Sequence, residues 1–360
     1  MQRWTIDPDI RKARTLTADF YRSQAVYEQL LESAFVPFWQ FVGHKGLVPE
    51  AGDCYPFELL AGSIEEPLVL VHGQDGETLC MSNVCTHRGK ILVEQPTKLR
   101  YISCGYHGRC FHLDGNFKSM PEFAETEDFP AASDNLTNLK LESLGAFLFT
   151  AIAPQHSFQE VFGPIMDRLF WFPFDDLTFV PEASTNYDID THWALYCDNY
   201  LEGFHVPFVH PGLGESLDYK NYSTEIFDHC NLQLGVADPS AAAFELPEGA
   251  KDHGMRIHAY YWWIFPNLML NVYTWGVSVN VVEPLGKDKT RVRFLTYLLP
   301  GQAANGFSQA MLHQTEMEDE EVVKSVHKGL KSRLYQYGRF SPKREQCVHH
   351  FQQLLANCLS

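Results

Sequence analysis

Apolar and polar residues alternate with different periods in different parts of the chain. Residues 17–35 carry apolar side chains near helical spacing, with Thr17 at the expected N-cap, and predict an N-terminal helical segment. From residue 38 to about residue 152, short apolar runs are cut by Gly, Pro and Asp, which is typical of closely spaced strands. Turn residues at 73–76 and 113–116 predict two hairpins in this region.

The pattern changes again after residue 154. The runs 258–282 and 290–299 predict long strands, and residues 302–335 predict a helix. We therefore expect an α+β chain in which an all-β domain precedes an antiparallel sheet backed by helices. The expected divisions are an N-terminal helical segment at 1–36 that packs on the last domain, the all-β domain at 37–155, and the sheet-and-helix domain at 156–360.

Composition narrows the function classes. The 360 residues include 28 Lys and Arg against 45 Asp and Glu, a formal charge of −17 that argues against nucleic acid or an anionic membrane as partner. The most apolar stretch, 260–272, contains Pro266 and is too short to span a bilayer. The N-terminus has no apolar signal core. Nine is an odd number of Cys, and the chain is far too long to need disulfides for its stability. We expect a cytoplasmic protein whose clustered Cys and His bind metal.

The strongest chemical signal is a pair of short motifs in the all-β region. Cys85-Thr86-His87 and Cys104-Gly105-Tyr106-His107 are separated by sixteen residues, and each lies next to a turn that contains a glycine, Gly89 or Gly108. Two hairpin tips with one thiolate and one imidazole each can hold either structural Zn²⁺ or a Rieske [2Fe–2S] cluster. Zinc fingers usually pair Cys with Cys and His with His, so the mixed order favours the cluster.

A second constellation lies in the last domain. His205 and His210 are five residues apart, roughly 140° around a regular α-helix, so shared metal binding requires a π-bulge or a helix break near Pro207. Two His and one carboxylate form the facial triad of non-haem Fe(II) oxygenases. Asp319 is the first candidate carboxylate and Glu318 the second, although an exposed acidic helix face would give the same pattern.

Both motifs together resemble the α (terminal oxygenase) subunits of Rieske non-haem iron oxygenases. The matching patterns are Cys-x-His-Arg-Gly, Cys-x-Tyr-His-Gly, Asn-x-x-Glu-x-x-His-x4-His and Glu-Asp-x-x-Val. The resemblance implies that one cluster iron is bound by Cys85 and Cys104 and the other by His87 and His107. It also implies that His205, His210 and Asp319 bind the mononuclear iron. The chain departs from the pattern at Gly105 and Arg109, where many relatives carry Pro and Trp.

The resemblance also implies how such a chain works. The catalytic domain would have a helix-grip-like fold, O₂ would be the co-substrate, and electrons would come from a ferredoxin or reductase. No Gly-x-Gly-x-x-Gly follows a strand, so NAD(P)H would bind only to that separate protein. A head-to-tail homotrimer is implied, in which Glu202 bridges a mononuclear-site histidine and a cluster histidine of the neighbouring subunit.

We expect a small-molecule substrate, and the aromatic residues of the last domain suggest which chemical class it belongs to. Trp263, Tyr273 and Trp275 lie in strands expected to wall the pocket, although ordinary core and strand packing is the favoured explanation for such an aromatic run. As a pocket they could cage a quaternary ammonium group or stack on a flat aromatic ring. The segment around Glu202 resembles choline, carnitine and betaine oxygenases, which favours hydroxylation or oxidative N-demethylation over aromatic-ring dioxygenation. A Rieske electron carrier would leave His205, His210 and about two hundred residues unexplained. A zinc-stabilised binding module would show neither the brown colour nor the EPR signal that we expect of a Rieske cluster.

Overall fold

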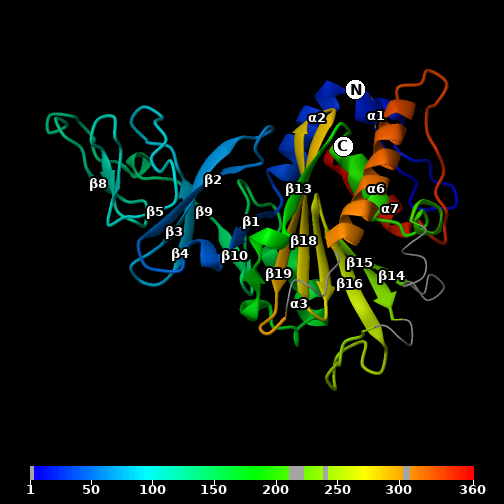
Figure 1. The fold of residues 1–360 in the computed structure, drawn as a ribbon. Helices are drawn as coiled ribbons and strands as arrows, with labels where there is room; N and C mark the ends of the chain where they lie inside the picture. The colour runs from blue at the N-terminus through cyan, green and yellow to red at the C-terminus, as the bar shows by residue number, and fades with distance from the viewer. Residues whose placement is uncertain (1–3, 211–222, 238–241, 303–308) are drawn as a thin grey trace. The chain divides into compact units, whose positions relative to one another are not determined.

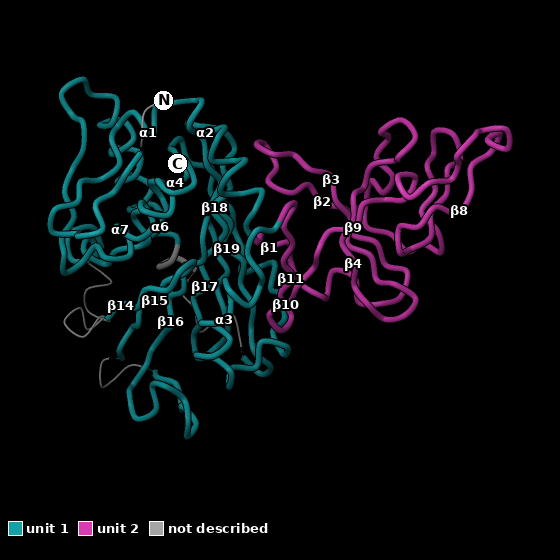
Figure 2. Tube along the Cα trace, turned by 180° about the vertical axis from the view of Figure 1, so that it is seen from behind, with its two compact units in different colours: residues 1–38, 154–360 teal, residues 39–153 magenta. Residues whose placement is uncertain are grey.

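The chain divides into two compact units, shown in separate colours in Figure 2. The computed structural model describes residues 4–210, 223–237, 242–302 and 309–360. The larger unit comprises residues 1–38 and 154–360, and the inserted unit comprises residues 39–153. Because the chain leaves the larger unit after Phe38 and returns at Pro154, the inserted unit interrupts one continuous fold (Figure 1).

The inserted unit consists mainly of short antiparallel strands, as predicted. Its sheets have the strand orders β5-β2-β3-β4-β9, β1-β11-β10 and β6-β7-β8. The elements are β1 (Gln40–His44), η2 (Lys45–Leu47), β2 (Asp53–Leu59), β3 (Glu66–His72), β4 (Thr78–Ser82), β5 (Thr97–Lys98), β6 (Ile102–Ser103), β7 (Cys110–Phe111), β8 (Phe117–Ser119), η3 (Ala132–Asp134), β9 (Asn138–Leu139), β10 (Leu141–Leu144) and β11 (Phe147–Thr150). Both predicted hairpins are confirmed, and Gly76 and Gly115 supply the positive φ of their turns.

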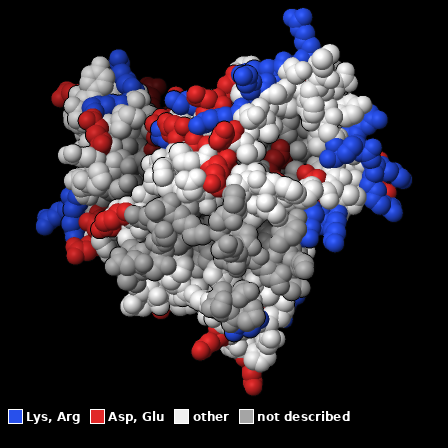
Figure 3. All heavy atoms as spheres, turned by 45° about the vertical axis from the view of Figure 1, so that its right-hand side comes forward, with Lys and Arg blue, Asp and Glu red and all other residues white. Residues whose placement is uncertain are grey.

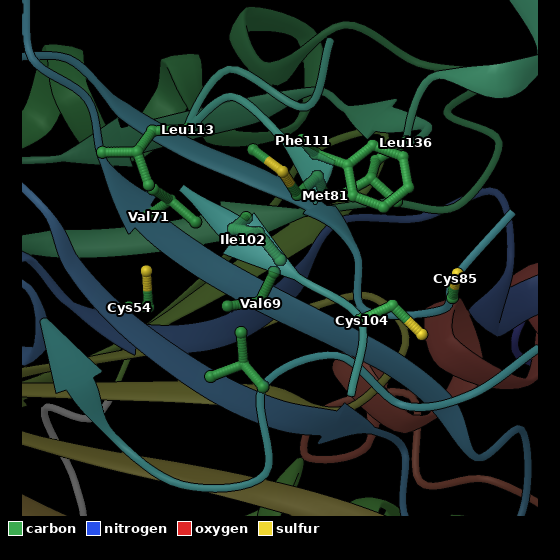
Figure 4. Close-up of a cluster of buried hydrophobic side chains, with 11 residues drawn as sticks. Cys54, Val69, Val71, Met81, Cys85, Ile102, Cys104, Phe111, Leu113 and Leu136 are labelled. Carbon is green, nitrogen blue, oxygen red and sulfur yellow. The ribbon is translucent and has the colours of Figure 1, made fainter. Parts of the chain in front are cut away.

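The core of the inserted unit reaches the two predicted metal-binding cysteines. Strands β3, β4, β6 and β7 contribute its buried side chains, among them Val69, Val71, Met81, Ile102 and Phe111. Figure 4 shows Cys85 and Cys104 near one another at the edge of this cluster. The motif cysteines are therefore anchored to a packed core, while the residues that follow them form loops.

The larger unit is organised around an eight-stranded antiparallel sheet. Its order is β12-β19-β18-β17-β16-β15-β14, and β13 also pairs with β19. The strands are β12 (Thr178–Phe179), β13 (Thr185–Ile189), β14 (Ser223–Ile226), β15 (Cys230–Val236), β16 (Ile257–Ile264), β17 (Leu268–Tyr273), β18 (Gly276–Gly286) and β19 (Lys289–Leu298). The two predicted apolar runs thus form four consecutive strands rich in β-branched and aromatic residues.

Helices back this sheet, which confirms the predicted α+β class. Helix α4 packs against β18, β19 and α6, and α3 packs against β16. The helices are α1 (Ala18–Arg22), α2 (Gln24–Leu30), η1 (Leu31–Phe35), α3 (Phe158–Arg168), η4 (Phe174–Asp176), η5 (Pro181–Ala183), α4 (Trp193–Tyr200), α5 (Val206–Val209), α6 (Gln309–Gly329) and α7 (Gln346–Cys358). Within the described residues, no helix combines the length and apolarity needed to cross a bilayer.

Three details of the helices differ from the sequence-based expectations. The segment 17–35 is split at Ser23, whose hydroxyl accepts from the Val26 N–H, whereas the Thr17 side chain caps nothing. The predicted helix over 302–335 ends at Gly329, a residue that readily leaves the helical conformation, and its part at 303–308 lies outside the described residues. Helix α7 was not predicted, although Cys347, Phe351 and Leu355 recur at the four-residue spacing of a buried helix face.

Candidate metal centres

Two loops of the inserted unit present the Cys and His pairs with the same backbone geometry. In each loop the cysteine N–H donates to the carbonyl five residues later, and the cysteine carbonyl accepts from the glycine N–H four residues later. Gly89 and Gly108 have φ of +71° and +75°, a conformation that residues with a Cβ adopt at a cost. The motif glycines therefore close the two loops, and this explains their place in the sequence pattern.

The side chains of these loops converge. The Cys85 and Cys104 thiols lie within hydrogen-bond reach of each other, and the His87 and His107 ring centroids are 4.7 Å apart. Burial raises the pKa of Cys85, while backbone N–H donors outweigh burial and lower the pKa of Cys104. Such N–H donors stabilise thiolates, which are the form that binds metal.

A buried nitrogen tests whether this set fits a metal cluster. Nδ1 of His87 is buried and has no hydrogen-bond partner among the described residues. An unpaired buried imidazole nitrogen is costly unless it coordinates something. Two neighbouring thiols, two neighbouring imidazoles and an unsatisfied ring nitrogen fit the two-Cys, two-His ligand set of a Rieske cluster.

The second centre lies where a helix is interrupted, as the five-residue spacing predicted. Helix α4 ends at Tyr200, and α5 begins at Val206. The break therefore lies before Pro207 in the sequence, and Pro207 is in the first turn of α5. Proline is compatible with that position, because the N–H groups of the first turn have no partner within the helix. His205 and His210 flank α5, and their ring centroids are 5.2 Å apart.

Asp319 on α6 completes this group. Its Oδ1 lies 3.4 Å from His205 Nε2 and 3.1 Å from His210 Nε2, and one potential ligand atom from each of the three side chains lies within 4.8 Å of the other two. The outer ring nitrogens face two further carboxylates: His205 Nδ1 lies 2.9 Å from Glu202 Oε1, and His210 Nδ1 lies 2.7 Å from Glu318 Oε2. Both rings thus direct Nε2 inward, and Glu318 occupies an outer position.

The electrostatics of this centre attract positive charge. Burial opposes ionisation of Asp319, but hydrogen bonds with both histidines outweigh it and lower the Asp319 pKa to about 2. Burial likewise opposes protonation of His205, yet Asp319 and Glu202 raise the His205 pKa to about 9. Asn199 Nδ2 donates to Asp319 Oδ1 at 2.7 Å and orients that carboxylate. Two imidazoles and a carboxylate suit Fe(II), which would compete with protons for the same nitrogens.

The aromatic residues proposed for the pocket occupy two different environments. Trp263 is buried and packs against Phe265 and Phe351, which is core packing. Tyr273 and Trp275 are partly exposed and stack with ring centroids 4.9 Å apart at 12°. Tyr261 belongs to the same aromatic run of the sequence as Trp263, and its ring centroid lies 5.9 Å from that of Tyr273.

This aromatic group continues the sheet face that α4 covers. Tyr261 pairs with Asn271 across β16 and β17, so their side chains share one face. Asn271 Oδ1 accepts a 2.6 Å hydrogen bond from the Tyr200 hydroxyl on α4, and Gln233 on β15 donates to the Tyr200 carbonyl at 3.0 Å. The partly exposed rings therefore lie on the face that helix α4 covers, and α4 leads into the His205 segment.

Comparison with protein families decides the class of these centres. The ring hydroxylating alpha subunit (catalytic domain) family matches residues 174–360, more than half of the chain. The chain belongs to this family. The Rieske [2Fe–2S] domain family matches residues 38–130 of this chain, so a cluster-binding domain and an iron-dependent catalytic domain occur in one polypeptide. The protein is a Rieske-type non-haem iron oxygenase, as the motifs indicated.

Individual relatives agree over nearly the whole length. The choline monooxygenase of Beta vulgaris is 30% identical, with 96% of this chain and 77% of the relative covered. The carnitine monooxygenase oxygenase subunit of Escherichia coli (strain K12) is 29% identical, with coverage of 96% and 94%. A solved quaternary ammonium Rieske monooxygenase, described in connection with carnitine oxidation and inter-subunit electron transfer, superposes with a TM-score of 0.78 at 25% identity, covering 98% and 97% of the two chains.

Proposed function

We propose that this Rieske oxygenase hydroxylates or oxidatively N-demethylates a small quaternary ammonium compound similar to choline, carnitine or betaine. The relatives named for choline and carnitine oxidation cover almost the entire chain and supply the main support. The partly exposed Tyr261, Tyr273 and Trp275 rings add a physical reason, because aromatic faces attract methylammonium cations. The same rings could stack on a flat aromatic substrate, so aromatic-ring dioxygenation is the alternative that the test must separate.

We assign the ligands as the motifs and the geometry suggest. Cys85, His87, Cys104 and His107 would hold the [2Fe–2S] cluster, and His205, His210 and Asp319 would hold the mononuclear Fe(II). When bound, the cluster supplies single electrons and the iron provides open positions for O₂ beside the substrate.

We infer that the carboxylates of Glu202 and Glu318, which lie on the outer side of the two rings, orient the histidines. Glu202 accepts from His205 Nδ1–H and from the His205 backbone N–H at 3.0 Å, and Glu318 accepts from His210 Nδ1–H. Each carboxylate thereby keeps the ring proton on Nδ1 and leaves the Nε2 lone pair for the metal. Asn199 holds the Asp319 carboxylate between the two rings.

Iron content and product formation test the proposal together. The purified protein is expected to contain three Fe and no zinc per chain, two in the cluster and one mononuclear. A coupled O₂-uptake screen with choline, betaines, carnitine and simple aromatics should show uptake with a methylammonium compound, together with formaldehyde or a hydroxylated product. Two Fe per chain would indicate an electron carrier, and a cis-dihydrodiol from an aromatic compound would establish the alternative.

We further propose that a separate electron donor docks on a basic segment of the larger unit, and that the oxygenase is a homotrimer. Residues 322–344 contain seven Lys and Arg and no Asp or Glu, in a chain of net charge −17. Lys328, Arg333 and Lys343 are exposed, and none forms an ion pair with a described acidic residue. Leu334, 96% exposed, adds an apolar contact. Figure 3 shows Lys and Arg gathered at the right of one face with few Asp and Glu among them, while both kinds of charge are mixed near the top of its centre. An acidic ferredoxin complements such a segment.

Charge reversal tests this docking surface. In stopped-flow reduction by a reduced acidic [2Fe–2S] ferredoxin, Arg333→Glu should lower the second-order rate about tenfold at low salt, because electrostatic steering is lost. Exposed Lys140 on the inserted unit provides the matched control, since Lys140→Glu changes the net charge equally. The difference between the variants should shrink as ionic strength rises. Equal rates for both variants at low salt would place the docking surface elsewhere.

A further inference from the structure

Arg109 is a buried cation in the loop that carries Cys104 and His107. It is 2% exposed and lies among the rings of three phenylalanines. Its guanidinium carbon is 5.9, 5.2 and 5.4 Å from the ring centroids of Phe111, Phe117 and Phe129. Because arginine stays protonated in such surroundings, a full positive charge is fixed inside the inserted unit.

One acidic residue partners this charge and also ties both metal-binding loops together. Arg109 Nη2 donates to Asp134 Oδ1, and Asp134 Oδ2 accepts from the Ala131 N–H at 2.7 Å. The Asp134 carbonyl accepts from Thr86 Oγ1 at 2.8 Å, which links it to the loop of Cys85. On the other side, the Arg109 carbonyl accepts the Cys104 N–H at 2.7 Å. Asp134 therefore connects the two loops directly, through Thr86 of the Cys85 loop and Arg109 of the Cys104 loop.

The two charges of the Arg109–Asp134 pair are screened by water to different extents. The Arg109 side chain is 2% exposed, whereas the Asp134 side chain is 20% exposed and nearer to screening water. Arg109 Nε is buried without a partner among the described residues, so one donor of the fork remains uncompensated. Because the Arg109 cation is the less screened partner and belongs to the Cys104 loop itself, its field should outweigh that of the Asp134 carboxylate at this loop.

We propose that Arg109 is a positioning residue that raises the reduction potential of the Rieske cluster, with Asp134 as its counter-charge and as the link between the loops. The inference rests on the cluster assignment above. Reduction adds one electron to the cluster, supplied by dithionite or an electrode in the test, and a nearby fixed cation favours the more negative reduced form. Removing the cation should disfavour the reduced cluster, and removing the anion should favour it.

Three variants, measured by redox titration and EPR after their cluster iron content is determined, test the proposal. Arg109→Met should lower the reduced-to-oxidised ratio about tenfold at a fixed potential, a shift of about 59 mV for one electron. Asp134→Asn should shift the potential in the opposite direction, because asparagine keeps an acceptor but removes the charge. Arg109→Lys should stay near the parent potential, since it keeps the charge.

The signs distinguish electrostatic tuning from simple support of the loops. Opposite shifts for Arg109→Met and Asp134→Asn support the proposal. Shifts in the same direction, unchanged potentials, or loss of the cluster in both Arg109 variants with an unchanged potential in Asp134→Asn would overturn it. A parent protein without a Rieske EPR signal would instead overturn the cluster assignment itself, so the two failures are distinguishable.

Discussion

Replacing Asp319 with alanine is expected to remove the mononuclear iron and to leave the Rieske absorption and EPR signals unchanged. The substitution deletes the one carboxylate oxygen that faces Nε2 of both His205 and His210, at 3.4 and 3.1 Å. It also removes the negative charge of the Asp319 carboxylate between the two rings, so that, of the three described candidate ligands, Fe(II) would retain only the two neutral imidazoles. Iron content should fall from three to two per chain, and oxygenase turnover should be lost with it.

Glu318→Ala is the control for this prediction, because Glu318 is adjacent in sequence and was the second candidate ligand. Its Oε2 accepts from His210 Nδ1–H at 2.7 Å, on the side of the ring away from Asp319. Loss of such an outer partner typically weakens metal affinity or activity about 10- to 100-fold without abolishing binding. Should Glu318→Ala lose the mononuclear iron while Asp319→Ala keeps it, the assignment of the carboxylate ligand is wrong.

The candidate ligands could be found from the sequence because most of their geometry is local. Each cluster loop supplies a cysteine and a histidine within four residues and closes on its own glycine. His205 and His210 are also near neighbours, and their spacing indicated an interrupted helix before the structure placed the break between Tyr200 and Val206. The strand runs of the larger unit could be read for the same reason, since strand composition is a local property.

What the sequence did not reveal depends on contacts between distant segments. Glu318 lies 108 residues from His210, so its outer position follows only from how α6 packs beside α5. The partnership of Arg109 and Asp134 spans 25 residues, and at the sequence level Arg109 was only a departure from a family pattern. Trp263 and Trp275 differ in the same way: both were candidate pocket residues, and packing against Phe351 places Trp263 in the core. Burial is decided by tertiary structure, which a linear pattern does not contain.

Replacing Glu202 with glutamine is expected to leave both metal centres bound and to abolish turnover coupled to the external donor. Glu202 Oε1 and Oε2 accept from two donors of His205, its Nδ1–H and its backbone N–H, at 2.9 and 3.0 Å. Glutamine has one acceptor oxygen, and its NH₂ group must face the other donor, so one of these hydrogen bonds is lost along with the charge. The His205 ring keeps its inner contacts, which is why the iron should remain.

Glu318→Gln separates the two roles that Glu202 could have. Each glutamate accepts from Nδ1–H of one of the two proposed iron ligands, His205 and His210, so a purely orienting role predicts similar losses for the two variants, about 10- to 100-fold. If Glu202 also bridges to the cluster of a neighbouring subunit, only Glu202→Gln should block electron transfer. Single-turnover experiments with pre-reduced protein measure this directly: product formation and cluster oxidation should stop in Glu202→Gln and persist in Glu318→Gln. Full coupled turnover in Glu202→Gln would remove Glu202 from the electron path.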